Sequence, residues 1–428
     1  MSSYKKQGIV ALSPMMFFVV VYLGASILFH DFYSFPLTIA FISSIIFAFV
    51  VYRKNTFKLL LDQFFEGCGE KNIMLMVWIF ILAGAFAGSA KDMGCVDATV
   101  DLCLRLLPSQ MIIPGLFIAS CFISISIGTS VGTIVAVMPI AAGLAKTCGF
   151  DPYMTAAVIV GGAFFGDNLS FISDTTIVAT TKMRCKMNDK FKVNSFIVFP
   201  AVIIVLAIYI FIGLHASSVD IDKEIQPIKV IPYLVVIIAA ACGMNVFKVL
   251  IVGILLTGII GVSSGAVTFN NWLQSLDAGI ISMAQLILIS MMAGGLLSLV
   301  QKNGGIAFLI EILTKHISGK KGAYYVIALL ICLVNLCTAN NTVAILSVGD
   351  ISWDISQRFS LDNRKCASIL DTMSCFTQGL IPYGAQILAA AGLAGLNPIG
   401  IVPYLYYPFA IGIVCVLSIF FRYPKRYS

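Results

Sequence analysis

Apolar runs close to the roughly 20 residues that cross a bilayer as a helix recur along this chain. They cover residues 9–28, 35–51, 73–90, 195–214, 250–262, 280–300 and 401–421. Only 11% of the 428 residues are charged, whereas a soluble domain carries about 25%. The sequence therefore predicts an all-α polytopic membrane protein in contact with lipid, with about 10–12 membrane-embedded helical segments.

The formal net charge of +7 does not indicate a nucleic-acid partner, because the cations gather in short connections, where they set topology. Connection 182–192 is basic and is predicted to be cytoplasmic, together with Lys190 and the other cations in it. Connection 217–226 is acidic and is predicted to lie outside. We expect an inner (plasma) membrane protein with both termini cytoplasmic.

The chain matches itself weakly at an offset of about 210 residues. The matched positions include 82–85 with 292–295, Gly94 with Gly304, and Thr129 and Thr133 with Thr338 and Thr342. Because the halves begin on opposite sides of the membrane, they are predicted to be inverted-topology repeats, residues 1–215 and 216–428. Many secondary transporters have this architecture, with the substrate site near the bilayer midplane.

Each half contains a long apolar stretch with a polar interruption. In residues 111–146 the interruption includes Gly128, Thr129, Ser130 and Thr133. In residues 324–356 it includes Thr338, Ala339, Asn340, Asn341 and Thr342. Each stretch is either a pair of spans or a re-entrant hairpin. We favour the hairpin, because irregular backbone at membrane depth must face protein or water.

The stretch 153–181 concentrates polar groups between apolar flanks. The candidate cation- or proton-binding residues are Asp167, Asn168, Ser170, Ser173, Asp174, Thr175 and Thr176. A carboxylate at bilayer depth costs about 2.5–3.5 kcal/mol on insertion scales, so two of them predict a use. Oxygen donors suit hard cations such as Na⁺. An aqueous loop, with Asp174 as a helix N-cap, is the alternative.

The counterpart stretch 370–391 contains several polar residues, among them Asp371 and Gln386. It is predicted to supply neutral ligands to the site. The predicted neutral ligands of the second half are Thr338, Asn340, Asn341, Thr342, Thr377, Gln378 and Tyr383. Asn340 and Asn341 could instead only cap or bridge helices.

The order Gly166-Asp167, then Ser173-Asp174-Thr175-Thr176, resembles the signature of the NhaC family of sodium/proton antiporters. The interruption at 128–133 is similar to that family too, but Phe171 stands where the family usually has Pro. The resemblance implies exchange of Na⁺ for H⁺, with Asp167 and Asp174 as the acidic residues. It also implies membership of a wider ion-transporter superfamily that contains carboxylate transporters with re-entrant hairpins.

Other functions were weighed on the same residues. A Na⁺- or H⁺-coupled exchanger of small organic anions or amino acids fits the polar second half. An intramembrane aspartyl protease does not fit, because its Gly-x-Gly-Asp is absent before Asp167, and no enzyme activity is expected. His30, His215 and His316 are far apart and no CxxC pair occurs, so no cofactor or metal beyond transported Na⁺ is expected. A homodimer is left open.

Overall fold

The computed structural model describes residues 3–28, 36–171, 173–214, 226–315 and 317–427. Over these residues the chain forms helices and no strand, which confirms the predicted all-α fold class. Among them, eight helices are long and apolar enough to cross a membrane, or nine if the bent pair Ala385–Ala394 and Pro398–Tyr404 is one span. The three histidines and residues 217–225 of the acidic connection lie outside the described residues.

The helices of the first half are α1 (Ser3–Leu28), α2 (Leu37–Val51), α3 (Phe57–Cys68), α4 (Lys71–Asp92), α5 (Cys95–Leu106), η1 (Ser109–Met111), α6 (Ile112–Ile127), α7 (Ser130–Cys148), α8 (Pro152–Leu169), α9 (Asp174–Lys182) and α10 (Met187–Gly213).

The helices of the second half are α11 (Pro227–Ala241), α12 (Val246–Ser263), α13 (Phe269–Ser282), α14 (Ala284–Lys302), α15 (Gly305–Thr314), α16 (Gly319–Thr338), α17 (Asn341–Arg358), α18 (Asn363–Gln378), α19 (Ala385–Ala394), α20 (Pro398–Ile401), η2 (Val402–Tyr404), α21 (Tyr406–Phe420) and η3 (Lys425–Tyr427).

Corresponding helices of the two halves begin and end with the same local chemistry. A side-chain oxygen caps the first turn, or a residue with positive φ reverses the chain, at matching places in both halves. The matching pairs are Thr56 and Thr268, Gly94 and Gly304, Gly128 and Ala339, and Asp151 and Asp362. The division into two repeats and their inverted orientation stay predictions.

Both polar interruptions are sharp breaks between two helices. Gly128, at φ +73°, ends α6, and the Thr129 side chain then accepts the backbone N–H of Gly132 to begin α7. Ala339 (φ +46°) and Asn340 do the same between α16 and α17. Ser109–Ile127 and Ser130–Cys148 are each long enough to cross a membrane, so the choice of hairpins over paired spans stays a prediction.

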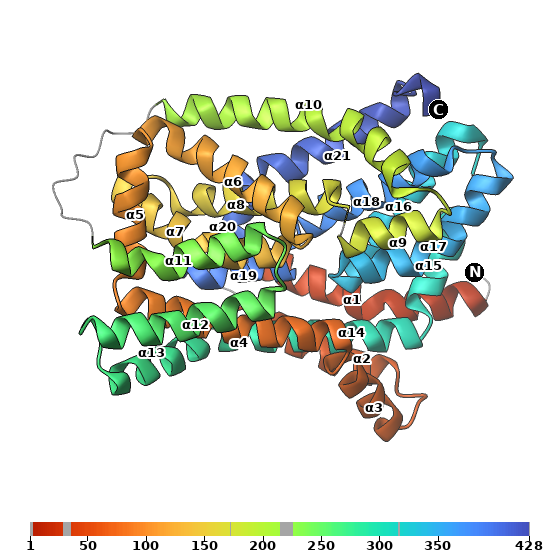
Figure 1. Ribbon diagram of the computed structural model, residues 1–428. Coiled ribbons are helices and arrows are strands. Elements are labelled where there is room, and N and C mark those ends of the chain that lie inside the picture. The colour runs from red at the N-terminus through yellow and green to blue at the C-terminus, as the bar shows by residue number, and fades with distance from the viewer. Residues whose placement is uncertain (1–2, 29–35, 172, 215–225, 316, 428) are drawn as a thin grey trace.

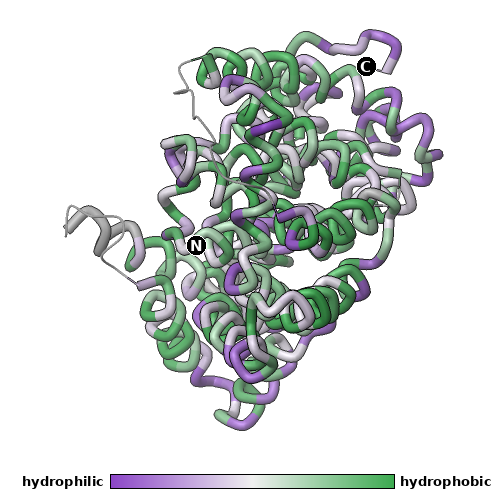
Figure 2. Tube along the Cα trace, turned by 60° about the vertical axis from the view of Figure 1, so that its left-hand side comes forward, coloured by the Kyte–Doolittle hydropathy of each residue, from purple (hydrophilic) through white to green (hydrophobic). Residues whose placement is uncertain are grey.

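The helices that carry the polar breaks lie between two outer groups. In Figure 1, α4, α12, α13 and α14 run along the lower edge, α10 and α21 lie along the upper edge, and α6–α9 with α16–α19 lie between them. Helix α7 packs against α8 and α19, while α17 packs against α18 and α9. The return arm of each break therefore contacts the broken helices of both halves. Figure 2 shows that most of the helical tube is hydrophobic, with hydrophilic residues frequent in the connections.

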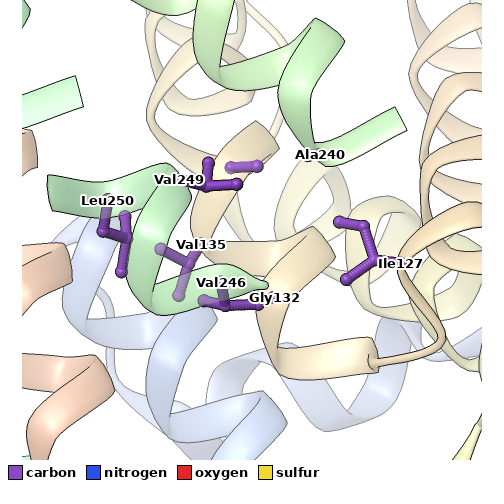
Figure 3. A pocket seen from close by; sticks show the side chains of 8 residues that line it. Ile127, Gly132, Val135, Ala240, Val246, Val249 and Leu250 are labelled. Carbon is purple, nitrogen blue, oxygen red and sulfur yellow. The ribbon is translucent and has the colours of Figure 1, made fainter. Parts of the chain in front are cut away.

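A small apolar cavity of about 10 Å³ lies where α7 meets α11 and α12. Figure 3 shows its lining side chains, which come from all three helices and from the end of α6. The lining residues are Ile127, Gly132, Val135, Ala136, Ala240, Val246, Val249 and Leu250. No polar side chain is among them.

Two glycine pairs bring helices of different halves into backbone contact. A Cβ on Gly84 would lie 2.4 Å from the carbonyl oxygen of Gly279, where α4 crosses α13. A Cβ on Gly67 would lie 2.4 Å from the carbonyl oxygen of Gly294, where α3 crosses α14. Small residues of this kind allow close helix packing in membranes. The crossings join the two halves away from the polar breaks.

Replacing Gly84 by Ala should lower the apparent Tm of the protein in detergent, because the added methyl group must displace the backbone of α13. Overpacking of this kind costs about 1–3 kcal/mol. Gly322→Ala in α16 is the matched control, since the nearest atom to its Cβ would be 3.8 Å away. An unchanged Tm for Gly84→Ala would show that the crossing is loosely packed.

Candidate functional site

The helix that carries Asp167 stops and restarts inside the apolar fold. Helix α8 ends before Ser170, whose backbone N–H donates to the carbonyl of Gly166 at 2.7 Å, and α9 begins at Asp174 with Ser173 as its N-cap. Helix ends leave backbone groups without intrahelical partners. The break therefore presents carbonyls from the end of α8 and N–H groups from the start of α9 to other elements.

The Asp167 carboxylate is buried, at 5% exposure, and two hydroxyls hold it. Ser130 Oγ, in the first turn of α7, donates to Oδ2 at 2.9 Å, and Ser173 Oγ donates to Oδ1 at 2.5 Å. Ser173 Oγ also lies 2.9 Å from Thr175 Oγ1. A hydrogen bond to a charged group contributes about 1.5–3 kcal/mol. The carboxylate thus links α7, the end of α8 and the start of α9.

A chain of neutral groups connects this carboxylate to the second half. Gln386 Nε2 donates to Ser130 Oγ at 3.0 Å. Gln378 Nε2 in turn donates to Gln386 Oε1 at 3.0 Å and to the Ala339 carbonyl at 2.8 Å. Gln378 Oε1 is buried and has no hydrogen-bond partner among the described residues. The tips of both helix breaks therefore meet through two glutamines.

A buried ion pair lies beside the carboxylate site. The Lys190 ammonium, 1% exposed, pairs with the carboxylate of Asp371, which is 0% exposed. Lys190 Nζ also donates to the Asn168 carbonyl at 2.7 Å and to Thr176 Oγ1 at 3.0 Å. Thr176 Oγ1 donates to Asp371 Oδ2 at 3.2 Å. Removing one partner of a buried pair costs about 3–5 kcal/mol, so the two charges must be retained together.

Amide groups fix the end of α8 in place. Asn194 Nδ2 donates to the Asn168 carbonyl at 2.9 Å and to its side-chain Oδ1 at 2.7 Å. Asn194 Oδ1 accepts the hydroxyls of Ser368 at 2.7 Å and Thr372 at 2.8 Å. One side chain of α10 therefore ties α8 to α18, that is, the first half to the second.

The two predicted acidic residues occupy different environments. Asp174 is the exposed first residue of α9, where a negative charge is favourable at a helix N-terminus. Asp167 is buried and hydrogen-bonded. Phe171, which replaces the expected Pro, is 43% exposed and stacks on Phe191 of α10 at a centroid distance of 4.7 Å. The break is therefore supported from α10 by an aromatic contact.

Most other predicted residues shape the backbone. Asn340 Oδ1 accepts the Val343 N–H at 3.0 Å and Asn341 Oδ1 accepts the Thr342 N–H at 3.1 Å, so both side chains bond to the backbone at the start of α17. Their role as ligands stays a prediction. Tyr383 donates to the Leu336 carbonyl at 2.7 Å. The hydroxyls of Thr133, Thr338, Thr377 and Ser170 likewise donate to the backbone carbonyls of Thr129, Asn340, Met373 and Ile125.

The sequence interpretation misplaced Lys190 and assigned no role in the site to Asn194 or to the charge of Asp371. It counted Lys190 among the cations of a cytoplasmic connection, but α10 begins at Met187 and turns this side chain inward. It also expected neutral ligands alone from the second half, whereas Asp371 contributes a charge. An ionisable residue inside apolar sequence commonly pairs with another one, and that tendency was the available signal.

A polar pocket of about 410 Å³ lies beside the start of α10. It is lined by Arg184, Cys185, Lys186, Asp189, Asp362, Asn363 and Arg364, which come from both halves. The Arg364 guanidinium donates to the carboxylate of Asp362, and this hydrogen bond raises the pKa of Arg364 above its usual value. The pocket borders Asp189, the residue next to Lys190 in the sequence.

A sequence model of the Na⁺/H⁺ antiporter family matches residues 7–218 and 224–424. The chain belongs to this family. Family membership makes it a multi-pass membrane transporter and confirms the resemblance on which the sequence interpretation rested.

Characterised relatives of similar sequence are named for different transported substrates. The Malate-2H(+)/Na(+)-lactate antiporter of Bacillus subtilis is 23% identical over 84% of this chain and 83% of its own length. The Na(+)/H(+) antiporter NhaC of the same organism is 25% identical over 82% and 84%. The arginine/ornithine antiporter ArcD of Halobacterium salinarum is 24% identical over 81% and 79%.

Asn194→Ala should destabilise the protein, because the side-chain Oδ1 of Asn168 loses its donor and the hydroxyls of Ser368 and Thr372 lose their acceptor. Each buried polar group left unsatisfied costs about 1–3 kcal/mol. The measurement is the apparent Tm in detergent, with Asn188→Ala, an exposed position on the same helix, as control. Equal Tm values for the two variants would contradict a structural role for the Asn194 network.

Proposed function

We propose that this chain exchanges Na⁺ for H⁺ across the inner membrane, with the Asp167 carboxyl group holding either ion. The observation that carries the proposal is the setting of this carboxylate, which is buried and held by the hydroxyls of Ser130 and Ser173. These two residues belong to the tip of the α6–α7 break and to the start of α9.

The same hydroxyls suit both states of the site. A serine hydroxyl has one donor and two acceptor lone pairs. It donates to the carboxylate, accepts from the protonated acid, or turns a lone pair toward Na⁺. Burial favours the neutral acid and a bound cation favours the carboxylate, so proton and Na⁺ compete for Asp167. Asp174, exposed at the start of α9, adds negative charge that attracts cations to the site.

Charge in the site favours a cation over an organic anion as the exchanged species. The buried ammonium next to Asp167 is Lys190, which is already paired with Asp371. An organic carboxylate would therefore approach an acidic residue without a free cation beside it. The printed substrates of two relatives, malate with lactate and arginine with ornithine, make a coupled organic-ion exchanger the second candidate.

Alternating access follows from which helices pack together. Helices α7, α8 and α19 contact one another, as do α17, α18 and α9, and the hydrogen bonds of Gln378 and Gln386 join the two groups. We propose that these helices move as one body relative to α4, α12, α13 and α14. Residues 1–215 and 216–428 would then be inverted repeats around one site near the midplane.

Asp167→Asn should abolish Na⁺-dependent collapse of ΔpH in everted membrane vesicles, because the amide neither releases a proton nor carries charge. Asp174→Asn should keep the maximal rate and raise the half-saturating Na⁺ concentration by up to about fivefold, as expected for an exposed charge. Asp354→Asn, exposed on α17, is the control.

Full activity of Asp167→Asn would refute the proposal. Collapse of ΔpH by malate, lactate or arginine without Na⁺ would favour the second candidate.

Reporter fusions test the proposed orientation. A fluorescent protein fused after Ser428 should be fluorescent, because it stays in the cytoplasm, and alkaline phosphatase inserted after Asp220 should be active outside. The opposite pattern at either site would contradict inverted repeats with cytoplasmic termini.

A further inference from the structure

The Lys190 ammonium is surrounded by the kinds of oxygen that bind metal cations. Its partners are the Asn168 carbonyl at 2.7 Å, the Thr176 hydroxyl at 3.0 Å and the carboxylate of Asp371. An ammonium group has three donors, and each has one of these acceptors. Carbonyl, hydroxyl and carboxylate oxygens are also the ligands of hard cations such as Na⁺.

Two of these oxygens are available because α8 is broken. The Asn168 carbonyl lies in the last turn of α8, where the negative end of the helix dipole favours a cation. Thr176 lies in the first turn of α9, on the other side of the break. Asp371 completes the cluster from α18, and its other oxygen has, among the residues that the structure describes, only the weak thiol donor of Cys375 at 3.8 Å. The cluster therefore spans the same break as the Asp167 site.

We propose that Asp371, Thr176 and the Asn168 carbonyl form a second monovalent-cation site that Lys190 fills permanently. The lysine is a tethered cation that replaces a second transported ion, and Asp167 is left as the single exchanging acid. This inference rests on the proposed function, since it assumes that Asp167 takes Na⁺.

Charge balance then sets the ion count. The buried site contains two carboxylates, Asp167 and Asp371, and one fixed ammonium, Lys190. One Na⁺ or one H⁺ at Asp167 makes the sum zero in each half of the cycle. Wild-type exchange is therefore one Na⁺ for one H⁺, and it does not respond to membrane potential. Without the ammonium, Asp371 needs a cation of its own.

Equilibrium binding of ²²Na⁺ to the purified full chain in detergent at alkaline pH tests the inference. We expect one Na⁺ per chain for wild type, two for Lys190→Gln, one for Lys190→Gln/Asp371→Asn and none for Asp167→Asn. Size-exclusion profile and apparent Tm report whether each variant is folded. A folded Lys190→Gln variant that binds one Na⁺, or a wild-type chain that binds two, would overturn the tethered cation.

The double variant keeps the test decisive if Lys190→Gln does not fold. Lys190→Gln/Asp371→Asn removes both charges and should bind one Na⁺ per chain, as the wild type does. A folded double variant that binds two Na⁺ or none would overturn the inference. If instead Asp167→Asn still binds Na⁺ while Lys190→Gln gains an ion, the proposed role of Asp167 fails and the tethered cation stands.

Discussion

The central constraint on this protein is that a broken helix inside an apolar fold must find partners for its backbone. At the end of α8 the Asn168 carbonyl accepts both the Lys190 ammonium and the Asn194 amide. Unsatisfied backbone groups at membrane depth cost several kcal/mol each. These two side chains of α10 therefore make the break tolerable, and the break in turn places Asp167 between α7 and α9. The position of the Asp167 carboxylate therefore depends on the hydrogen bonds that Lys190 and Asn194 donate to the next residue, Asn168.

The two halves share their backbone plan but not their chemistry. Helix caps and positive-φ residues recur at matching positions. At the α6–α7 break Thr129 caps the second helix, and at the α16–α17 break Asn340 does so. The charges are distributed differently. Asp167 lies at the end of α8, whereas Asp371 lies inside α18 and faces a lysine of the other half. Similar caps thus surround an asymmetric site, in which one acid pairs with a lysine and the other is held by two hydroxyls.

Features that depend on a few neighbouring residues, such as the helix breaks, were predictable from the sequence. The glycine and hydroxyl-rich interruptions marked both breaks, and the polar run after Gly166 marked the acid that is buried there. The pair of Lys190 and Asp371 was not predictable in the same way, because 181 positions separate its members and a lysine near a basic connection is typical of topology signals. The Gly84–Gly279 crossing was equally hidden, since glycine is frequent in membrane helices. Asn340 and Asn341, predicted as ligands, both accept backbone N–H groups at the start of α17.

The cavity between α7, α11 and α12 has a consequence for motion. Its lining is entirely aliphatic or glycine, and Gly132 brings the backbone of α7 against Val246, whose methyl group would lie 2.3 Å from a Cβ at that position. Across this contact, displacement of α7 exchanges one apolar neighbour for another and breaks no hydrogen bond within the lining. The interface resists separation through its buried area but offers little resistance to lateral sliding. The movement of α7 proposed above would therefore meet little resistance at this boundary.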